Sequence, residues 1–591
     1  MKQAAREGPA KGWPVLLRLL GGFLRPQAGA VSLVVVLMAV QGAGNLYLPA
    51  LNASIINNGV LQGDVGYIWR LGGIMLGTVL ALGVVSVVTV RWASRAAMRV
   101  GADMRTAIYR RVREFSAEEM SKFGISSLVT RNINDVQQVQ MFLLMTLTTL
   151  VAALIMGVGS VIMAVREGRV LSLLLVVTVP VMALAVTAVI IGMVALFRAI
   201  QVKIDRINQL LREQITGARV IRAFLRTRSE QDRFREANED MTAVTLRAAR
   251  ILSGIMPLLL GIAYLTSVGV IWFGGRLVNE GSLSIGNLSA FLIYIMQILL
   301  ALGSSVAVVI LVPRAVASAE RIAQVLTTVP AIADPPRPAT RGKPSGAVKF
   351  SRVTFGYPGS ERPVLRDVSF SLQPGQTTAV VGGTGSGKST LVNLIPRFLD
   401  ATGGAVLVNG INVRKQSAAQ LRSTIGLVPQ AAFLFAGTVA SNLRFGSPEA
   451  SDEELWHALE VAQALDFVAS MPGQLDAPID QGGTNVSGGQ RQRLSIARAL
   501  VRRPRLYLFD DCFSALDTAT DARLRAALRA EAEDAAMLVV AQRASTVLQA
   551  DQIIVLDAGT TAGIGTHPQL LSDCGPYREL VLSQLGEGAI A

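Results

Sequence analysis

The loop from Gly382 to Thr390 constrains this chain more than any other stretch. Its sequence, GGTGSGKST, fits the pattern G-x-x-x-x-G-K-[ST] that forms phosphate-binding loops. Glycines in such a loop let backbone N–H groups turn inward and cradle phosphates. Lys388 would reach the β- and γ-phosphates, and the Ser389 hydroxyl would hold Mg²⁺. The predicted contacts to ATP come from Gly382, Gly383, Thr384, Gly385, Ser386, Gly387, Lys388, Ser389 and Thr390.

The stretches on either side of this loop suit the same role. Thr377 to Val381 is a short apolar run, as expected of a buried strand, and Ser389 to Phe398 has a helical pattern. A helix that begins at the loop would direct the positive end of its dipole at the phosphates. Strand, loop and helix together predict an α/β domain that binds and uses ATP.

The composition indicates that another part of the chain lies in a membrane. The length of 591 residues predicts at least two domains. Hydrophobic residues make up 51% and charged residues 16%, and the mean hydropathy is +0.45. The net charge of +15 is attributed to membrane topology and anionic lipids, and no nucleic-acid partner is expected, because the arginines cluster beside apolar spans. With only Cys512 and Cys574, a disulfide framework is not expected.

Six apolar segments are each long enough to cross a bilayer, which takes about 20 helical residues. They span residues 28–53, 68–90, 141–165, 171–197, 251–273 and 288–312. A short amphipathic stretch, Pro14 to Leu24, precedes them and is predicted to be an elbow helix at the membrane surface. The even number of spans keeps both termini on one side.

Basic residues set the predicted orientation. The links after the second and fourth spans are long and rich in arginine, whereas the links near Asp64, Glu167 and Glu280 are short and poor in basic residues. The charge bias therefore places the long links, both termini and the ATP module in the cytoplasm. The membrane is expected to be the inner, or plasma, membrane of the cell.

The two long links are predicted to be helical extensions of the spans. Met104, Ile108, Val112 and Phe115 recur at helical spacing in the first link. Each link is interrupted near its middle, at residues 123–126 and 216–224. A reversal there would leave a short crosswise helix that could contact a cytoplasmic ATP module.

The spans carry no Asp, Glu, Lys or Arg near a midplane, which argues against transport of ions or protons. The polar residues there are Gln41, Asn45, Asn52, Gln297, Ser304 and Ser305. Amides and hydroxyls among Leu, Met and Phe suit an amphipathic or apolar cargo, although each can equally join one helix to another. Pro49, Pro180 and Pro257 lie within spans and are expected to kink them.

Several motifs follow a Pro-rich linker, TTVPAIADPPRPATRGK. Tyr357 lies upstream of the phosphate loop, where an aromatic ring can stack on adenine, and Gln430 ends an apolar strand from which it could reach Mg²⁺. A basic amphipathic helix begins with Ser487, Gly488, Gly489 and Gln490, and its N-terminus is a second site where an anion could bind. The strand LYLFD ends at Asp510, the acid of a Walker B strand that holds Mg²⁺; Asp511 and the sequence SALD follow it.

These motifs, in this order, resemble the ATP-binding cassette (ABC) family, and the six spans ahead of them resemble its exporter half-transporters. The likeness runs from about Pro14 to Leu585. It implies a dimer in which each ATP lies between the phosphate loop of one chain and Ser487 to Gln490 of the other. It also implies that the crosswise helices near Gly124 and near Gly217 and Arg219 are coupling helices. The first would touch its own cassette and the second the partner's.

Two positions depart from the family pattern. Family members with an active site have Glu after the Walker B Asp, where it positions water; this chain has Asp511. Asp is one methylene shorter than Glu. A general base must lie within about 2.6–3.2 Å of the heavy atom whose proton it takes. The family also has His after the last strand of the site, where this chain has Gln542, which cannot carry a proton or charge. Together they predict a site that binds ATP and hydrolyses it poorly.

The sequence thus predicts an all-α six-span transmembrane domain with long cytoplasmic helical extensions, followed by an α/β P-loop nucleotide-binding domain. The predicted domains are an N-terminus and elbow helix (1–26), a transmembrane domain (27–326), a linker (327–346) and an ATP-binding domain (347–591). The expected function is ATP-driven export of a lipid or drug-like molecule by a heterodimer with a second, non-identical half-transporter. An importer of a bulky ligand and an ATP-gated regulator or channel subunit remain alternatives, whereas the six spans exclude a soluble enzyme of nucleic-acid repair.

Overall fold

A computed structural model describes residues 12–339 and 345–585 of the chain. The chain divides into two compact units. The first holds the chain up to Arg113 and Phe123–Val329, and the second holds Glu114–Lys122 together with the chain from Pro330 onward. The short stretch between Glu114 and Lys122 therefore leaves the helical unit in which its neighbours lie.

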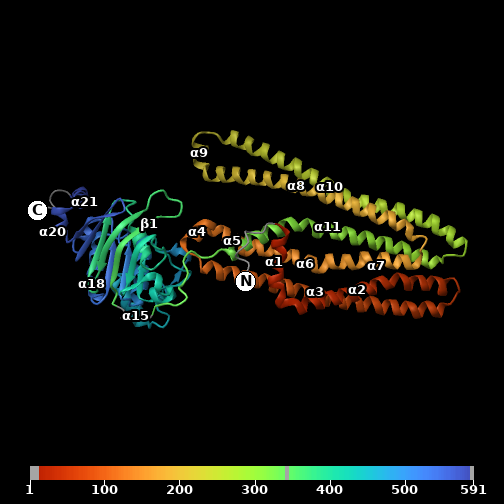
Figure 1. The fold of residues 1–591 in the computed structure, drawn as a ribbon, viewed down its shortest axis with the longest axis horizontal. Coiled ribbons are helices and arrows are strands. Elements are labelled where there is room, and N and C mark those ends of the chain that lie inside the picture. The colour runs from red at the N-terminus through yellow and green to blue at the C-terminus, as the bar shows by residue number, and fades with distance from the viewer. Residues whose placement is uncertain (1–11, 340–344, 586–591) are drawn as a thin grey trace. The chain divides into compact units, whose positions relative to one another are not determined.

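The first unit consists of helices (Figure 1). Its α-helices are α1 (Trp13–Leu24), α2 (Ala28–Ser54), α3 (Val65–Arg113), α5 (Ile125–Thr130), α6 (Val136–Met145), α7 (Val151–Glu167), α8 (Ser172–Thr216), α9 (Ala218–Ala223), α10 (Thr227–Asn279) and α11 (Ile285–Thr327). A 3₁₀ turn, η1 (Arg25–Gln27), and three π-helical turns, η2 (Ile55–Val60), η3 (Arg131–Asp135) and η4 (Thr146–Leu150), join some of them. In the described part of the chain, six continuous helical stretches are long and apolar enough to cross a membrane, as predicted.

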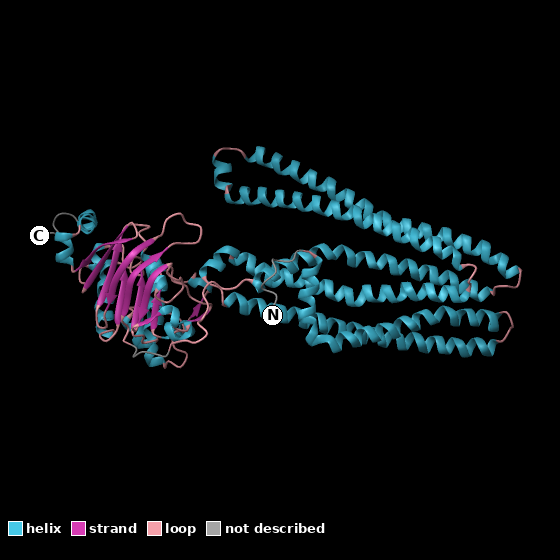
Figure 2. Cartoon of the chain, in the orientation of Figure 1, coloured by secondary structure: helices cyan, strands magenta, loops and turns pink. Residues whose placement is uncertain are grey.

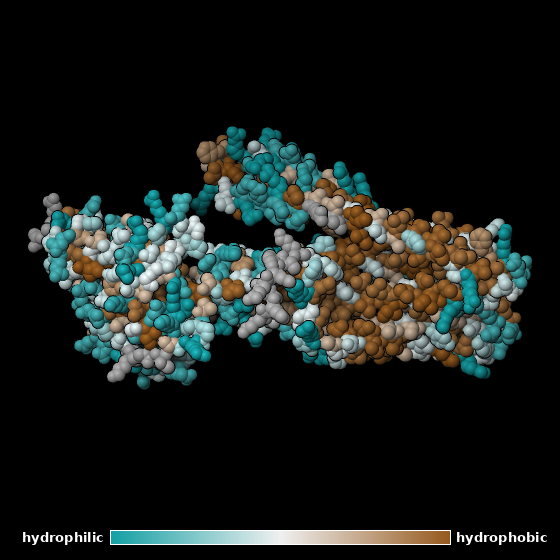
Figure 3. Space-filling view, in the orientation of Figure 1, coloured by the Kyte–Doolittle hydropathy of each residue, from teal (hydrophilic) through white to brown (hydrophobic). Residues whose placement is uncertain are grey.

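Helix length and apolar surface agree with a membrane-embedded unit. The long helices run well beyond a span: α3 has 49 residues and α10 has 53, which is about 80 Å at 1.5 Å per residue. Hydrophobic residues form a broad band over the part of this unit that holds the spans, while hydrophilic residues cover the extensions of α8 and α10 (Figure 3). Those two helices diverge from α11 toward α9, at the tip of their hairpin (Figure 1).

Small residues let the membrane helices approach closely. A Cβ atom on Gly42 of α2 would lie 2.4 Å from Ile155 of α7, and one on Gly159 of α7 would lie 2.2 Å from Leu46. Because lipid tails are as apolar as the helices, such close packing supplies much of their association. The centre of the unit is α11, whose Phe291 and Tyr294 are fully buried.

The C-terminal end of α2 and the N-terminal end of α11 meet at a polar contact that the sequence analysis did not identify. Asn57 in η2 donates to the Ser284 hydroxyl at 2.8 Å and accepts from the backbone N–H of Gly286 at 2.8 Å. A Cβ on Gly286 would lie 2.2 Å from the carbonyl oxygen of Ala53 and 2.6 Å from the Asn57 amide oxygen. This position admits only glycine without backbone movement.

Gly286→Val is therefore expected to destabilise the helical unit. The added side chain must displace backbone and break the Asn57 contacts, which costs about 1–3 kcal/mol. Thermal unfolding in detergent should show a lower midpoint. The matched control is Gly77→Val in α3, where no atom lies within 4 Å of an added Cβ. Equal midpoints for the two variants would contradict the importance of this contact.

The second unit contains an α/β domain and most of α4 (Ala117–Phe123), which belongs to this unit up to Lys122 (Figure 2). Its strands are β1 (Val348–Phe355), β2 (Leu365–Leu372), β3 (Thr377–Gly382), β4 (Gly403–Val408), β5 (Ile411–Asn412), β6 (Ile425–Val428), β7 (Gly437–Thr438), β8 (Pro478–Ile479), β9 (Leu506–Asp510), β10 (Ala536–Val540), β11 (Gln552–Asp557) and β12 (Thr560–Gly565). Its remaining helices are α12 (Lys388–Leu394), α13 (Ala418–Ser423), α14 (Val439–Arg444), α15 (Asp452–Val461), α16 (Leu465–Ser470), α17 (Gly488–Val501), α18 (Thr518–Glu531), α19 (Ala544–Val547), α20 (His567–Asp573) and α21 (Gly575–Leu585), with 3₁₀ turns η5 (Val413–Lys415), η6 (Gln474–Asp476) and η7 (Gln481–Gly483).

The main sheet has the order β12-β11-β3-β10-β9-β6. β11, β3, β10, β9 and β6 are parallel, and every residue of β9 and β10 is buried. Because parallel strands are covered on both faces, such strands read as continuous apolar runs. Their carboxyl ends meet at one edge of the sheet, which is where ligands bind in open α/β sheets. A second, antiparallel sheet has the order β2-β1-β4-β5.

The predicted fold class, six apolar spans followed by an α/β nucleotide-binding domain, is confirmed. One local prediction is wrong: the helix after the phosphate loop ends at Leu394 instead of Phe398. Pro396 follows, and its lack of a backbone N–H removes a hydrogen bond that a longer helix would need. The domain boundaries stay predictions; residues 1–11, 340–344 and 586–591 of the predicted domains lie outside the described residues.

Candidate functional site

The phosphate loop joins the end of β3 to the start of α12. Two of its glycines are packed against neighbouring strands: a Cβ on Gly382 would lie 2.2 Å from the Leu556 carbonyl, and one on Gly387, which has φ +100°, would lie 2.7 Å from Leu365. The other two, Gly383 and Gly385, have no atom within 4 Å of an added Cβ. One side of the loop is thus fixed to the sheet, and the other is open to a ligand.

The polar side chains of this loop converge on its inside. Lys388 is buried, and its ammonium group donates to the carbonyl oxygens of Gly382 and Gly383 at 2.8 Å each. Burial lowers the pKa of Lys388, and the nearby Asp511 and Asp510 oppose this shift. The Ser386 hydroxyl is buried without a hydrogen-bond partner among the described residues. An orphaned hydroxyl and a buried cation beside open glycines fit a phosphate chain.

Ser389 and Asp510 lie together, as a magnesium site requires. The Ser389 hydroxyl donates to the Asp510 carboxylate at 3.1 Å. Burial raises the pKa of Asp510, while the hydrogen bond from Ser389 opposes the shift. A hydroxyl and a carboxylate are hard oxygen ligands of the kind Mg²⁺ prefers, so these two residues fit the ion. The side-chain nitrogen of Gln430, the third predicted ligand, donates to Asp511, and its amide oxygen is the atom that could bind the ion.

Asp511 links the two loops that flank the site. One oxygen of its carboxylate accepts hydrogen bonds from the Gln430 amide at 3.1 Å and from the Gln542 amide at 2.9 Å. The residue is buried and its φ is +48°, a left-handed conformation that is rare outside glycine. Burial raises its pKa, whereas the bond from Gln430 and the charges of Lys388 and Arg543 lower it. The two positions that depart from the family pattern are therefore in direct contact.

Tyr357 lies just after β1 and beside the phosphate loop. Its hydroxyl is 3.2 Å from the Thr390 hydroxyl, and its ring meets Phe355 edge-on at 5.0 Å. The side chain is 45% exposed, so its ring retains a face that can stack on a base.

Ser487 is the N-cap of α17, and Gly488, Gly489 and Gln490 form its first turn. The Ser487 hydroxyl caps the helix by accepting from the Gln490 N–H at 3.2 Å, and the Gln490 side chain accepts from the Ser487 N–H at 2.9 Å. Both Ser487 and Gly488 are exposed, and no atom lies within 4 Å of a Cβ added to Gly488. The helix thus presents an exposed, positively polarised end.

The predicted coupling residues lie at the two short helices. Gly124, with φ +75°, ends the turn between α4 and α5 and is the N-cap of α5. Within the second unit, buried Glu119 of α4 accepts from the Ala331 N–H at 2.9 Å. Gly217 precedes α9, which has no buried residue, and Arg219 is exposed on it. Hydrophobic side chains gather at this tip (Figure 3), and Phe224 and Leu225 there are 74% and 88% exposed.

Five of the six predicted polar residues of the spans fall into two groups. Ser304 and Ser305 donate to the Ala301 carbonyl of their own helix, so they are internal to α11. Asn45, Asn52 and Gln297, by contrast, line a pocket of about 460 Å³ between α2, α3, α7 and α11. Gln41 does not line it. The sequence analysis missed two partners, Ser160 and Tyr294, because only their contacts to other helices distinguish them from ordinary span residues.

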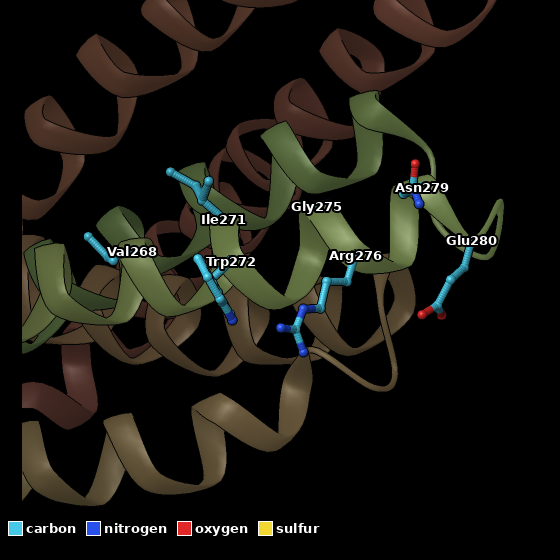
Figure 4. Close-up of a pocket in the computed structure, with 7 residues that line it drawn as sticks. All are labelled: Val268, Ile271, Trp272, Gly275, Arg276, Asn279 and Glu280. Carbon is cyan, nitrogen blue, oxygen red and sulfur yellow. The ribbon is translucent and has the colours of Figure 1, made fainter.

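A second hollow, of about 600 Å³, lies along the C-terminal end of α10 (Figure 4). It is lined by Val268, Ile271, Trp272, Gly275, Arg276, Asn279 and Glu280. The Arg276 guanidinium lies 5.2 Å from the centre of the Trp272 ring. Trp and Arg at the end of a span are typical anchors at the membrane–water interface.

Comparison with known protein families agrees with this geometry. Residues 31–302 match the model of the ABC transporter transmembrane region, and residues 365–514 match the model described as ABC transporter. An uncharacterized ABC transporter ATP-binding protein of Mycobacterium tuberculosis is 45% identical over 96% of this chain and 98% of its own length. The chain belongs to the ABC transporter family. It is a multi-pass membrane protein of the exporter-type half-transporter class, and its cassette binds ATP and implies ATPase activity coupled to transport.

Other relatives show how wide the family is. A fatty acid ABC transporter ATP-binding/permease protein of Mycobacterium tuberculosis is 34% identical over 77% of this chain and 71% of its own. An ATP-dependent lipid A-core flippase of Syntrophus aciditrophicus is 31% identical over 83% of this chain and 82% of its own. A solved structure of a bacterial Atm1-family ABC exporter with ATP bound superposes with a TM-score of 0.77, covering 95% of this chain and 99% of that one. At 24% identity, that likeness shows the fold.

Proposed function

We propose that this chain is one half of a heterodimeric exporter of hydrophobic or amphipathic molecules, with a degenerate ATP site on its own Walker motifs. The observation that carries this proposal is the contact of Asp511 with Gln430 and Gln542. The two amide hydrogen bonds to one of its oxygens fix the Asp511 side chain, and Asp is one methylene shorter than Glu, so its other oxygen is poorly placed to position water. Gln542 can donate a hydrogen bond there but cannot bear charge.

The remaining residues of the cassette retain the ability to hold ATP. Lys388, the open loop backbone and Ser386 would bind the phosphates, and Tyr357 would stack on the base. Ser389 and Asp510 would hold Mg²⁺, and the Gln430 side-chain oxygen would add a third ligand while its N–H donates to Asp511. Bound Mg²⁺ would neutralise phosphate charge. The chain's own site would thus mainly bind ATP, and the bound ATP would support closure of the dimer.

The partner's site depends on Ser487, Gly488, Gly489 and Gln490 of this chain. Their exposed helix end would complete the site on the partner's Walker motifs, where turnover takes place. The helices at Gly124 and at Gly217 and Arg219 would transmit the movement. Glu119 ties α4 to its own unit, while exposed α9 carries apolar side chains that suit contact with the partner's cassette.

The uncharged pocket in the spans and the basic helical extensions support the proposed cargo and compartment. The pocket-lining residues of α2, α3, α7 and α11 include no ionisable side chain. The fatty acid and lipid A names of two relatives are consistent with amphipathic cargo. The arginine-rich extensions support a cytoplasmic position for the cassette and both termini, in the inner or plasma membrane.

Transport by the complex in vesicles is expected to favour uncharged amphipaths or cations with delocalised charge. A small multiply charged ion would lose its hydration in this pocket, and the amides there carry no charge that could offset the free-energy cost. The test compares ATP-dependent movement of rhodamine 123 with that of citrate, using the complex copurified from its native membrane through a tag on this chain. Preference for citrate would contradict the proposed cargo class.

A further inference from the structure

A proline near the C-terminal end of α2 leaves one backbone carbonyl without its helical partner. Pro49 has no N–H, so the carbonyl oxygen of Asn45, four residues earlier, loses its helical partner. The side-chain amide of Gln297 in α11 points to this carbonyl, with 3.5 Å between nitrogen and oxygen. Within a membrane an unsatisfied carbonyl is costly, and a neighbouring helix commonly supplies the missing donor.

Gln297 is held in place from its other end. Its amide oxygen accepts from the hydroxyl of Ser160 in α7 at 3.0 Å, and Ser160 is fully buried. One turn along α11, the Tyr294 hydroxyl donates to the Leu46 carbonyl at 2.8 Å. The amide of Gln297 is therefore a fixed polar group in the wall between α2 and α11, and its second N–H remains available.

Two further amides face the same space without partners. Asn45 and Asn52 lie seven residues apart, on one face of α2, and both line the pocket of about 460 Å³ beside Gln297. No hydrogen bond joins either side chain to another residue in the described part of the chain. Apolar residues, including Met75 and Met156, form the rest of the wall. This volume lies within the range of about 300–1,000 Å³ typical of ligand pockets.

We propose that this pocket is a cargo subsite that binds the uncharged, hydrogen-bonding headgroup of an amphipathic molecule, such as a primary amide. Asn45 and Asn52 would pair with the headgroup, Gln297 would donate its free N–H, and the two methionines would adapt to the adjoining chain. The inference rests on the proposed export of amphipathic molecules and names the headgroup class.

The absence of charge in this wall sets the specificity. The lining residues include no Lys or Arg that could pair with a carboxylate or phosphate. A neutral amide can satisfy both donors and acceptors of an Asn, whereas a carboxylate only accepts and would lose its hydration without a counter-charge. A fatty amide should therefore bind more tightly here than the fatty acid of equal length.

The test uses radiolabelled hexadecanamide and unlabelled hexadecanoate. Binding to the purified complex in detergent micelles is measured by scintillation proximity, with hexadecanoate as competitor. The double change Asn45→Leu and Asn52→Leu should weaken hexadecanamide binding about ten- to thirtyfold, since two hydrogen bonds are lost. The double change Asn45→Ser and Asn52→Ser keeps a polar group at each position. Its affinity for hexadecanamide should be much closer to that of the unaltered complex than the affinity of the Leu double variant is. Asn58→Leu, whose amide lies outside the pocket and contacts Tyr67 at 3.5 Å, is the matched control.

The outcomes separate this inference from the exporter function. If the Leu double variant binds hexadecanamide as tightly as the Asn58→Leu control does, or if hexadecanoate competes equally well, the pocket assignment is wrong. Vesicles with the same complex then test transport of the amide. If the binding results are as expected but ATP moves no amphipathic probe, the pocket stands and the exporter function is wrong.

Discussion

Purified as a homodimer, this chain is expected to show very little ATPase activity. Both of its sites would then pair Asp511 with Gln542. In each, the carboxylate is retracted by one methylene and held by the amides of Gln430 and Gln542. A displacement of about 1 Å from productive geometry can cost about 10²-fold in rate, so turnover at least that far below the rate of the complex with its partner is expected.

The measurement is steady-state phosphate release in detergent or nanodiscs, by the homodimer and by the complex copurified from the native membrane. Lys388→Ala in the homodimer sets the background, because it removes the cation that holds the phosphates. Binding of a fluorescent ATP analogue to the unaltered homodimer should remain measurable. Robust turnover by the homodimer, well above the Lys388→Ala background, would refute the heterodimer proposal.

Much of the fold could be predicted because its signals are local. A span is recognised from about 20 consecutive apolar residues, and the phosphate loop from nine neighbouring ones. β9 and β10 are fully buried, so their apolar runs showed where the main sheet lies. These features depend on residues adjacent in the sequence, and the structure places them as expected.

The contacts that define the candidate sites could not be predicted in the same way. Gln430 and Gln542 lie 81 and 31 residues from Asp511, and Ser160 lies 137 residues from Gln297. Their hydrogen bonds depend on strand order and helix packing, which no local pattern records. The place of Gln430 after a strand predicts an Mg²⁺ ligand, but no local pattern records that its side-chain N–H donates to Asp511 or that Asp511 has a left-handed conformation. Pro49 carries a signal that the sequence analysis used only to predict a kink: a proline in a helix also frees the carbonyl four residues earlier, which here belongs to Asn45.

In the complex with its partner, Gly488 is expected to matter far more than Asp511. No atom lies within 4 Å of a Cβ on Gly488, so Gly488→Phe leaves this chain's own fold unstrained. The phenyl ring would instead occupy the space where the partner's phosphates approach α17, and ATPase activity should fall by at least about 10²-fold. Gly575→Phe, at the first residue of α21 with the same open surroundings, is the matched control and should retain activity.

Asp511→Asn should leave most of the activity of the same complex, because the proposed heterodimer would hydrolyse ATP on the partner's Walker motifs. Lys388→Ala should be intermediate, since it weakens ATP retention at the degenerate site and with it the closed state. The converse change is the most informative: Asp511→Glu with Gln542→His restores the family residues and should give the second site some hydrolytic ability. Steady-state ATPase of each variant complex decides among these. If Asp511→Asn abolishes turnover as fully as Gly488→Phe does, Asp511 is a working base, and the two hydrogen bonds to its carboxylate do not disable it.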